Sequence, residues 1–397
     1  MRFLSVLVFC VTTLSFAAMG QQRGPTIGVD GSRELVKVST RSSDGTISKI
    51  LTTCFNMHGS YSVTASGSHF LIQVNPSGTN RASLMIFGGD GSQLKHSEIV
   101  SGADIEDAAL RAIDRAVYKT SGLRGFFGGK LAFVSDRTGS KELYTSSFLL
   151  RNVRYWTNDR ANVVRPRWSP TGDSVLFSSD KQGGFDIYEV DFNSQRVFER
   201  LERRNSTNSG AVYSPDGASV ALIASPNGNP ELYWGQRSFR GLTNLSNTRS
   251  GNEAAPSWSP DGTQLVLASG VGGKPQLYLT SIRGGMRRLP TNFSGYCAEP
   301  CWNPFDRDKI SYTAAVGSGF QIVVHSLAAG KSVQVSREGS ADAIESEWLN
   351  DGRHLIYTRR TANRRSIVLL DTVSLKSTTL SSSSFGNVSQ VSFLAPR

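Results

Sequence analysis

Hydrophobic and polar positions repeat with a fixed period over the last two thirds of the chain. Each copy has an aromatic residue, Ser, Pro, a small polar residue and Gly, followed by a short apolar run. The copies are Trp168–Gly172, Tyr213–Gly217 and Trp258–Gly262, with degenerate copies at Trp302–Pro304 and Trp348–Gly352. The aromatic positions are separated by 45, 45, 44 and 46 residues. This period is typical of a four-stranded β-propeller blade.

Every copy predicts the same order of strands. The aromatic residue ends a first strand, and Pro-Asp-Gly makes a tight turn, because Pro presets φ and Gly accepts the left-handed conformation. An apolar second strand follows, then an aromatic and β-branched third strand and a more polar fourth strand. Second strands are predicted to begin near Leu131, Val175, Val220, Leu265, Ile310 and Leu355.

The first of these six blades, starting at Lys130, has no aromatic-ended strand ahead of it. Phe393 lies 45 residues after Trp348, in register with the series. The C-terminus is therefore predicted to supply the innermost strand of the first blade and to close a six-bladed ring, which removes exposed strand edges. An open β-solenoid with the same period is the alternative, and the C-terminal return argues against it.

Residues 21–125 do not carry the repeat. The segment 104–119 has apolar residues on one face at helical spacing, acidic residues in its first turn and Gly122 as a stop. A short helix is expected at 46–55, and strands at 68–75, 82–87 and 96–100. The fold class predicted is mainly β: a small α/β domain, 21–125, followed by a six-bladed β-propeller, 126–397.

The first twenty residues differ from the rest. Arg2 precedes the apolar run Phe3–Val11, and small residues lead to Gly20. This pattern predicts a Sec-type signal peptide, residues 1–20, that is cleaved after Gly20. A membrane anchor is the alternative, but the apolar run is too short to span a bilayer. No later stretch is long and apolar enough for a transmembrane helix, so the mature chain is expected to be soluble outside the cytoplasm.

The excess of basic over acidic residues indicates which classes of partner the chain could bind. The chain has 43 Lys and Arg against 32 Asp and Glu, a formal net charge of +11. This excess favours acidic partners or anionic surfaces, although a generic basic surface explains it equally well. The basic residues are scattered, which argues against nucleic acid.

No recognised catalytic, nucleotide or metal motif is present, so we expect no enzyme activity, no cofactor and no metal. An odd number of cysteines remains after leader cleavage: Cys54, Cys297 and Cys301. The five histidines are dispersed in sequence and are expected to be isolated: His58, His69, His96, His325 and His354. Asp342, Glu345 and Glu347 are expected to face solvent. The blade tryptophans are expected in the core between blades rather than on a stacking platform.

The order of parts resembles the TolB family, the soluble component of the Tol-Pal envelope system of Gram-negative bacteria. The resemblance rests on the leader, on the junction Ser121–Phe126 ahead of Leu131–Val134, and on six blades with Trp-Ser-Pro-Asp-Gly anchors. It implies a periplasmic, monomeric, protein-binding scaffold that supports outer-membrane integrity and cell division.

The resemblance also implies partners and a site. A peptidoglycan-associated lipoprotein (Pal) binds the propeller mouth of the family, and a TolA-like protein binds the N-terminal segment, here about 21–33. The matching mouth loops precede the aromatic anchors, at Val164–Pro166, Asn208–Ala211, Glu253–Pro256 and Ala298–Pro300. The candidate partner-binding residues are Arg165, Pro166, Asn208, Glu253, Pro256, Glu299 and Pro300.

Two other functions remain open from the residues alone. A lactonase- or lyase-type propeller enzyme requires several His or carboxylates on the innermost strands, and Arg167, Val212, Ser257 and Cys301 do not supply them. A carbohydrate-binding propeller requires exposed aromatic residues on the rim, where Tyr296 is the clear candidate.

Overall fold

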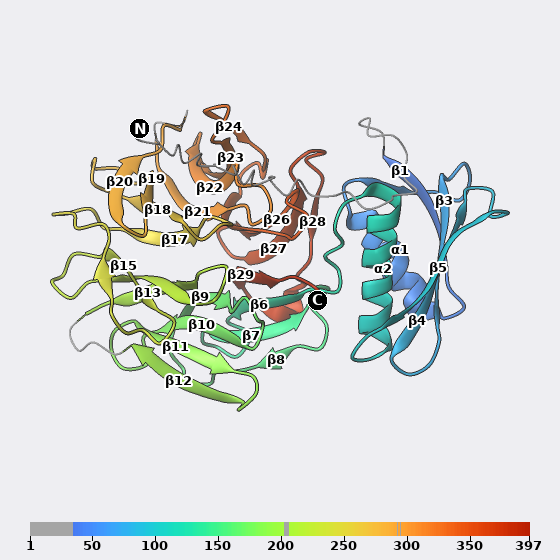
Figure 1. Ribbon diagram of the computed structural model, residues 1–397, viewed down its shortest axis with the longest axis horizontal. Helices are drawn as coiled ribbons and strands as arrows, with labels where there is room; N and C mark the ends of the chain where they lie inside the picture. The colour runs from blue at the N-terminus through green and yellow to red at the C-terminus, as the bar shows by residue number, and fades with distance from the viewer. Residues whose placement is uncertain (1–34, 202–205, 292, 294) are drawn as a thin grey trace, which may run out of the picture.

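The computed structural model describes residues 35–201, 206–291, 293 and 295–397. The predicted leader and the 21–33 segment lie outside the described residues. Within this part of the chain, an α/β domain packs beside a ring of six four-stranded sheets (Figure 1). The predicted fold class is confirmed.

The α/β domain has one five-stranded sheet in the order β2-β1-β3-β4-β5. β1 is parallel to β2 and β3, and the pairs β3–β4 and β4–β5 are antiparallel. Its elements are β1 (Val36–Arg41), α1 (Gly45–Met57), β2 (Tyr61–Val63), β3 (Phe70–Pro76), β4 (Arg81–Gly88), β5 (Leu94–Ser101) and α2 (Ile105–Ser121). Both helices lie on the side of the sheet that faces the propeller (Figure 1).

The two helices begin and end where their sequence signals lie. Asp44 caps α1 by accepting a hydrogen bond from the Ile47 amide, and Asp104 caps α2 through the Asp107 amide. Gly122 ends α2 with φ of 74°, a left-handed conformation that glycine adopts without strain. The predicted apolar face of α2 is buried against β3, β4 and β5.

The first blade is completed by the end of the chain, as predicted. Its order is β29-β6-β7-β8, and Phe393 of β29 pairs with Leu131 of β6. Its strands are β6 (Lys130–Ser135), β7 (Glu142–Ser147), β8 (Arg154–Tyr155) and β29 (Val388–Leu394). The short 3₁₀ helix η1 (Ser383–Phe385) precedes β29.

The other five blades are contiguous in sequence, each with the first strand innermost. Blade two has β9 (Val163–Trp168), β10 (Ser174–Ser179), β11 (Asp186–Asp191) and β12 (Arg196–Leu201). Blade three has β13 (Asn208–Tyr213), β14 (Ser219–Ala224), β15 (Glu231–Gln236) and β16 (Thr243–Asn244). Blade four has β17 (Ala254–Trp258), β18 (Gln264–Ser269), β19 (Gln276–Ser281) and β20 (Gly284–Arg288). Blade five has β21 (Cys297–Trp302), β22 (Lys309–Val316), β23 (Gly319–Ser326) and β24 (Lys331–Gln334). Blade six has β25 (Asp342–Trp348), β26 (His354–Arg360), β27 (Arg365–Asp371) and β28 (Ser377–Thr379).

The anchor motif works as predicted. The aromatic residue ends the innermost strand, and the side chain of the following Ser organises the turn: Ser214 Oγ bonds Asp216 Oδ1 at 2.5 Å and accepts from the Ser219 amide at 2.9 Å. The tryptophans lie between blades. Trp348 is buried and its Nε1 donates to the Cys301 carbonyl of the preceding blade at 3.1 Å. The prediction of an inter-blade core is confirmed.

The α/β domain and the propeller share one hydrophobic core. This core joins α1 and α2 to strands of the first and sixth blades through Phe126, Phe127 and Phe148. His58, which follows α1, stacks on Phe126 and lies 4.5 Å from His354 of β26 between ring centroids. The prediction of isolated histidines is wrong for this pair, because docking of the two domains joins residues almost 300 positions apart in sequence.

Candidate functional site

The innermost strands share one irregularity that shapes the channel. In every blade the register between the first and second strand shifts at a β-bulge. One residue of each bulge has a left-handed conformation, with φ between 52° and 63°. These six residues, which we call the channel ring, are Arg165, Gly210, Ala255, Glu299, Glu345 and Gln390. Bulges of this kind re-aim side chains next to functional sites.

The ring residues of blades from opposite ends of the chain bond to one another. The Arg165 amide donates to Gln390 Oε1 at 2.8 Å, and Gln390 Nε2 donates to Glu345 Oε1 at 2.9 Å. The Glu345 amide donates to Glu299 Oε2 at 3.0 Å. These links join blades two, one, six and five around a small cavity that also contacts Arg167 and Ser346. Four of the six ring residues therefore form one polar network, whereas Gly210 and Ala255 of blades three and four have no polar side chain to join it.

The charges in this network are only partly exposed. Arg165, Glu299 and Glu345 are half-buried. Burial, followed by the nearby Glu345 carboxylate, raises the pKa of Glu299, while Thr313 and Arg165 oppose the shift. Farther along the same strands Arg167 forms an ion pair with Glu347 at 3.4 Å. The channel thus presents acceptor oxygens and two guanidinium groups in a setting of reduced solvation, where charge-assisted hydrogen bonds are strong.

The predicted mouth loops are in fact strands. Of the seven candidate residues only Glu253 precedes its strand, and the other six lie within β9, β13, β17 and β21. The loop assignment is wrong because the strands begin before the bulge and continue through it. Arg165 and Glu299 belong to the channel ring. Pro166, Pro256 and Pro300 directly follow ring residues and are buried.

Asn208 and Glu253 have buried side chains that bond within the propeller: Asn208 joins blade three to blade two, and Glu253 bonds within blade four. Asn208 has no exposed surface and donates to Asp186 Oδ1 at 2.9 Å. Glu253 is 2% exposed and accepts from Ser269 Oγ at 2.8 Å. Burial raises the pKa of Glu253. Neither side chain offers a polar group to a partner in this conformation.

Sequence reasoning missed Glu345 and Gln390 as site residues. The prediction that Glu345 and Glu347 face solvent is wrong, because their strand lines the channel. A signal was present: every ring residue lies three positions before the repeated aromatic residue of its innermost strand. The residue types themselves gave no hint, since only one of the six is glycine.

The remaining chemistry-bearing candidates are placed as follows. Among the described residues Cys54, Cys297 and Cys301 are free and buried. Tyr296, the rim aromatic, is 37% exposed and packs edge-on against Phe320 with ring centroids 5.3 Å apart. Across the described ranges no helix has the length and apolar character needed to cross a bilayer.

Fold and channel together define a closed six-bladed β-propeller protein with an N-terminal α/β domain. The family model of the TolB β-propeller domain matches residues 127–250 and 229–393. The chain belongs to this TolB β-propeller family, and the predicted resemblance is confirmed. Family membership, rather than any absence in the structure, supports the prediction that the chain is not an enzyme.

Curated relatives match over a limited length. The Tol-Pal system protein TolB of Desulfotalea psychrophila is 28% identical over 101 residues, which cover 25% of this chain and 23% of that protein. The Ruegeria protein of the same name is 35% identical over 101 residues, covering 24% and 21%. The TolB homolog of Chlorobaculum tepidum is 34% identical over 88 residues, covering 21% and 20%. These matches span about a fifth to a quarter of the relatives' length.

The fold as a whole is similar to a solved TolB structure. TolB from Acinetobacter baumannii superposes with a TM-score of 0.81 at 20% identity, covering 92% of this chain and 97% of that one. A putative TolB from Agrobacterium tumefaciens has a TM-score of 0.52 at 17% identity, covering 64% and 88%. Both likenesses concern the fold, and the first includes the α/β domain as well as the propeller.

Proposed function

We propose that this chain is a periplasmic component of a Tol-Pal envelope system and binds a peptidoglycan-associated lipoprotein at the propeller channel. Through that contact it would support outer-membrane integrity and cell division. The names of the curated relatives and the TolB-like fold support the assignment to the system. A TolA-like partner for the 21–33 segment is part of the same proposal.

The observation that carries the proposed site is the channel ring. It gathers Arg165, Glu299 and Glu345 from three blades around one small cavity. A rigid scaffold with converging polar groups is the usual form of a recognition site. Half-buried charges of both signs suit a partner segment that carries complementary charges and backbone groups, because each truncated charge leaves its counterpart unpaired.

Direct binding between purified mature protein and a purified Pal-type lipoprotein domain tests the site. Arg165→Gln removes the guanidinium from the ring, and Arg196→Gln makes the same chemical change at an exposed position on β12. We expect Arg165→Gln to weaken binding at least tenfold and Arg196→Gln to leave it unchanged, measured by isothermal titration calorimetry. The loss corresponds to about 1.4 kcal/mol or more, typical of a buried charge contact.

Glu345→Gln provides a second, independent variant in the same ring. Equal affinities of wild type and both ring variants would move the site away from the channel. Binding of sugar fragments in place of the lipoprotein would contradict the scaffold function itself. Substitution of Glu253 is not a useful probe, because its bonds to Ser269 and Thr248 are structural.

A further inference from the structure

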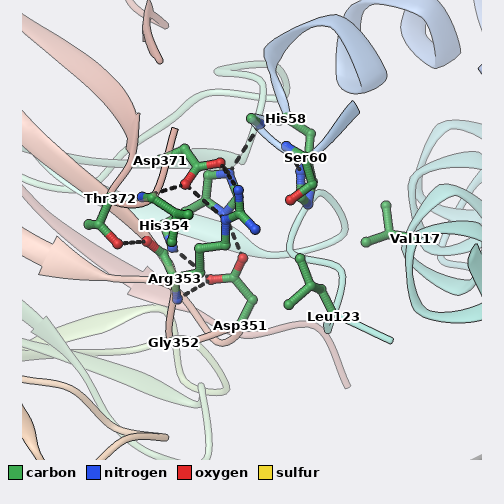
Figure 2. A network of polar contacts seen from close by, with 12 residues as sticks. His58, Ser60, Val117, Leu123, Asp351, Gly352, Arg353, His354, Asp371 and Thr372 are labelled. Atoms are coloured by element: carbon green, nitrogen blue, oxygen red, sulfur yellow. Dashed lines mark hydrogen bonds and ion pairs between the residues drawn. The ribbon is translucent and has the colours of Figure 1, made fainter. Parts of the chain in front are cut away.

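A cluster of ligand-type side chains lies where the α/β domain meets the propeller, and it includes no residue of the channel ring (Figure 2). His58 directly follows α1, whereas Asp351 and His354 lie in the turn and at the start of β26 in the sixth blade. Each offers one ligand atom, and these atoms lie within 4.8 Å of one another. The three side chains have no exposed surface.

Two buried polar atoms at this place have no hydrogen-bond partner among the described residues. They are His58 Nε2 and Ser60 Oγ. His58 Nδ1 accepts a hydrogen bond from the Ser60 amide at 3.2 Å, which leaves Nε2, the other ring nitrogen, without a partner. An unpaired polar atom in a buried site costs about 1–3 kcal/mol, so an arrangement that gives His58 Nε2 a partner is favoured.

The surrounding charges favour a cation. Asp351 and Asp371 bring two carboxylates to the cluster. Arg353 offsets one of them, since its guanidinium nitrogens bond the Asp371 oxygens at 2.8 and 2.7 Å. Asp351 Oδ2 lies 2.5 Å from His354 Nδ1 and fixes the orientation of that ring. The charge of the other carboxylate, Asp351, therefore remains to attract a cation.

We propose that His58, Asp351 and His354 bind a divalent transition metal of the zinc class and thereby fasten the α/β domain to the propeller. Two imidazoles and a carboxylate suit zinc-class ions, whereas calcium and magnesium prefer oxygen ligands alone. Ligands of a tetrahedral zinc site lie about 3.3 Å apart, given bonds of about 2.0 Å. Zinc binding therefore has to displace a hydrogen bond of His354, either the one between Nδ1 and Asp351 Oδ2 at 2.5 Å or the one that Nε2 accepts from the Gly59 amide at 3.3 Å.

Coordination also gives the unpaired His58 Nε2 a partner. His58 binds the metal through Nε2, and its ring proton then resides on Nδ1. That proton is incompatible with the hydrogen bond that Nδ1 now accepts from the Ser60 amide, so this bond breaks when the metal binds. Because His58 belongs to one domain and the other two ligands to the other, metal binding and domain docking are thermodynamically coupled.

The test uses the whole mature protein after dialysis against EDTA. Zinc is titrated in competition with a chromophoric chelator, and cobalt is added separately to detect the visible absorption of a four-coordinate complex. We expect one zinc ion per chain and a zinc-dependent rise in the unfolding temperature. His58→Gln and His354→Gln should each weaken zinc binding at least tenfold and abolish the temperature rise.

His69→Gln is the matched control, because His69 belongs to the same domain and the hydrogen bond found for its side chain is the one that Nδ1 accepts from the Lys37 amide. It should bind zinc like the wild type. Should a histidine variant fail to fold by circular dichroism, Asp351→Asn replaces it. Wild-type protein without stoichiometric zinc binding, or His58→Gln with unchanged affinity, would overturn the proposal.

Discussion

Asp114 shows how one buried carboxylate supports the junction between the domains. It lies in α2, is 9% exposed, and accepts hydrogen bonds from the Phe127 and Gly128 amides at 2.8 Å each. Gly125 approaches so closely that a Cβ there would lie 2.2 Å from Asp114 Cα. Burial raises the pKa of Asp114 to about 7, although both amides and Arg111 oppose the shift. The linker between the domains is thus held by hydrogen bonds to a carboxyl group whose pKa is about 7.

This shift predicts a pH dependence of stability. Because the folded pKa lies above the unfolded value of about 3.9, the folded state holds the proton more tightly. The contribution of Asp114 is therefore fully present below about pH 4 and is lost as pH rises through 7. Urea unfolding at pH 5 and pH 8 measures it. Asp114→Asn should be less stable overall but should lose less free energy between the two pH values than wild type; an unchanged difference would contradict the assignment.

The innermost strand of the first blade is the element on which ring closure depends. β29 pairs with β6 along its length, and its residues Val388 and Val391 are buried. It also supplies Gln390 to the channel ring. Without β29 the β6 edge is unpaired, and exposed edges promote association between chains.

Deletion of residues 388–397 therefore has a strong expected effect. Loss of two buried valines alone costs about 3–6 kcal/mol, and the open edge of β6 should drive oligomerisation. Size-exclusion chromatography with light scattering and thermal unfolding report the two effects. Deletion of only 395–397 leaves β29 in place and should retain a monomer. A stable monomer after the longer deletion would show that the ring does not need this strand.

At the level of strands and blades, the sequence was largely sufficient to predict the fold but insufficient to predict the candidate site. The 45-residue period and the position of Phe393 predicted six blades and their closure, because strand order follows from turn chemistry and hydrophobic pattern. The bulges escaped prediction. Their left-handed conformation is imposed by strand geometry on Arg, Ala, Glu and Gln alike, so no residue type marks it. The pairing of His58 with His354 was equally hidden, since it arises only when the domains dock.

The two domains behave as one body because a single core runs between them. Gly59, in the loop after α1, lies directly against the sixth blade: a Cβ there would meet Asp371 Oδ2 at 1.9 Å. Its amide also donates to His354 Nε2 at 3.3 Å. The close approach requires glycine, and it ties the position of the α/β domain to that of β26 and β27.

Gly59→Ala is therefore expected to loosen the domains. The wild type should unfold in one calorimetric transition, whereas the variant should show two, with the α/β domain melting first. Gly45→Ala is the control: this glycine begins α1, and a Cβ there would meet nothing within 4 Å. It should leave the transition single and slightly raise its temperature. Two transitions in the wild type would disprove the shared core.

Closure by the last strand also determines when, during synthesis, the propeller can complete its folding. Ser135, which ends β6, bonds to Phe385 near the start of the returning segment, 250 residues later. During synthesis β6 emerges early, and its edge stays without β29 until nearly the whole polypeptide has been made. Contacts this distant in sequence form slowly, because the chain loses the entropy of the long loop before the contact contributes any favourable free energy. The first blade to be made is consequently the last to be completed, and a chain interrupted anywhere before β29 cannot close its ring.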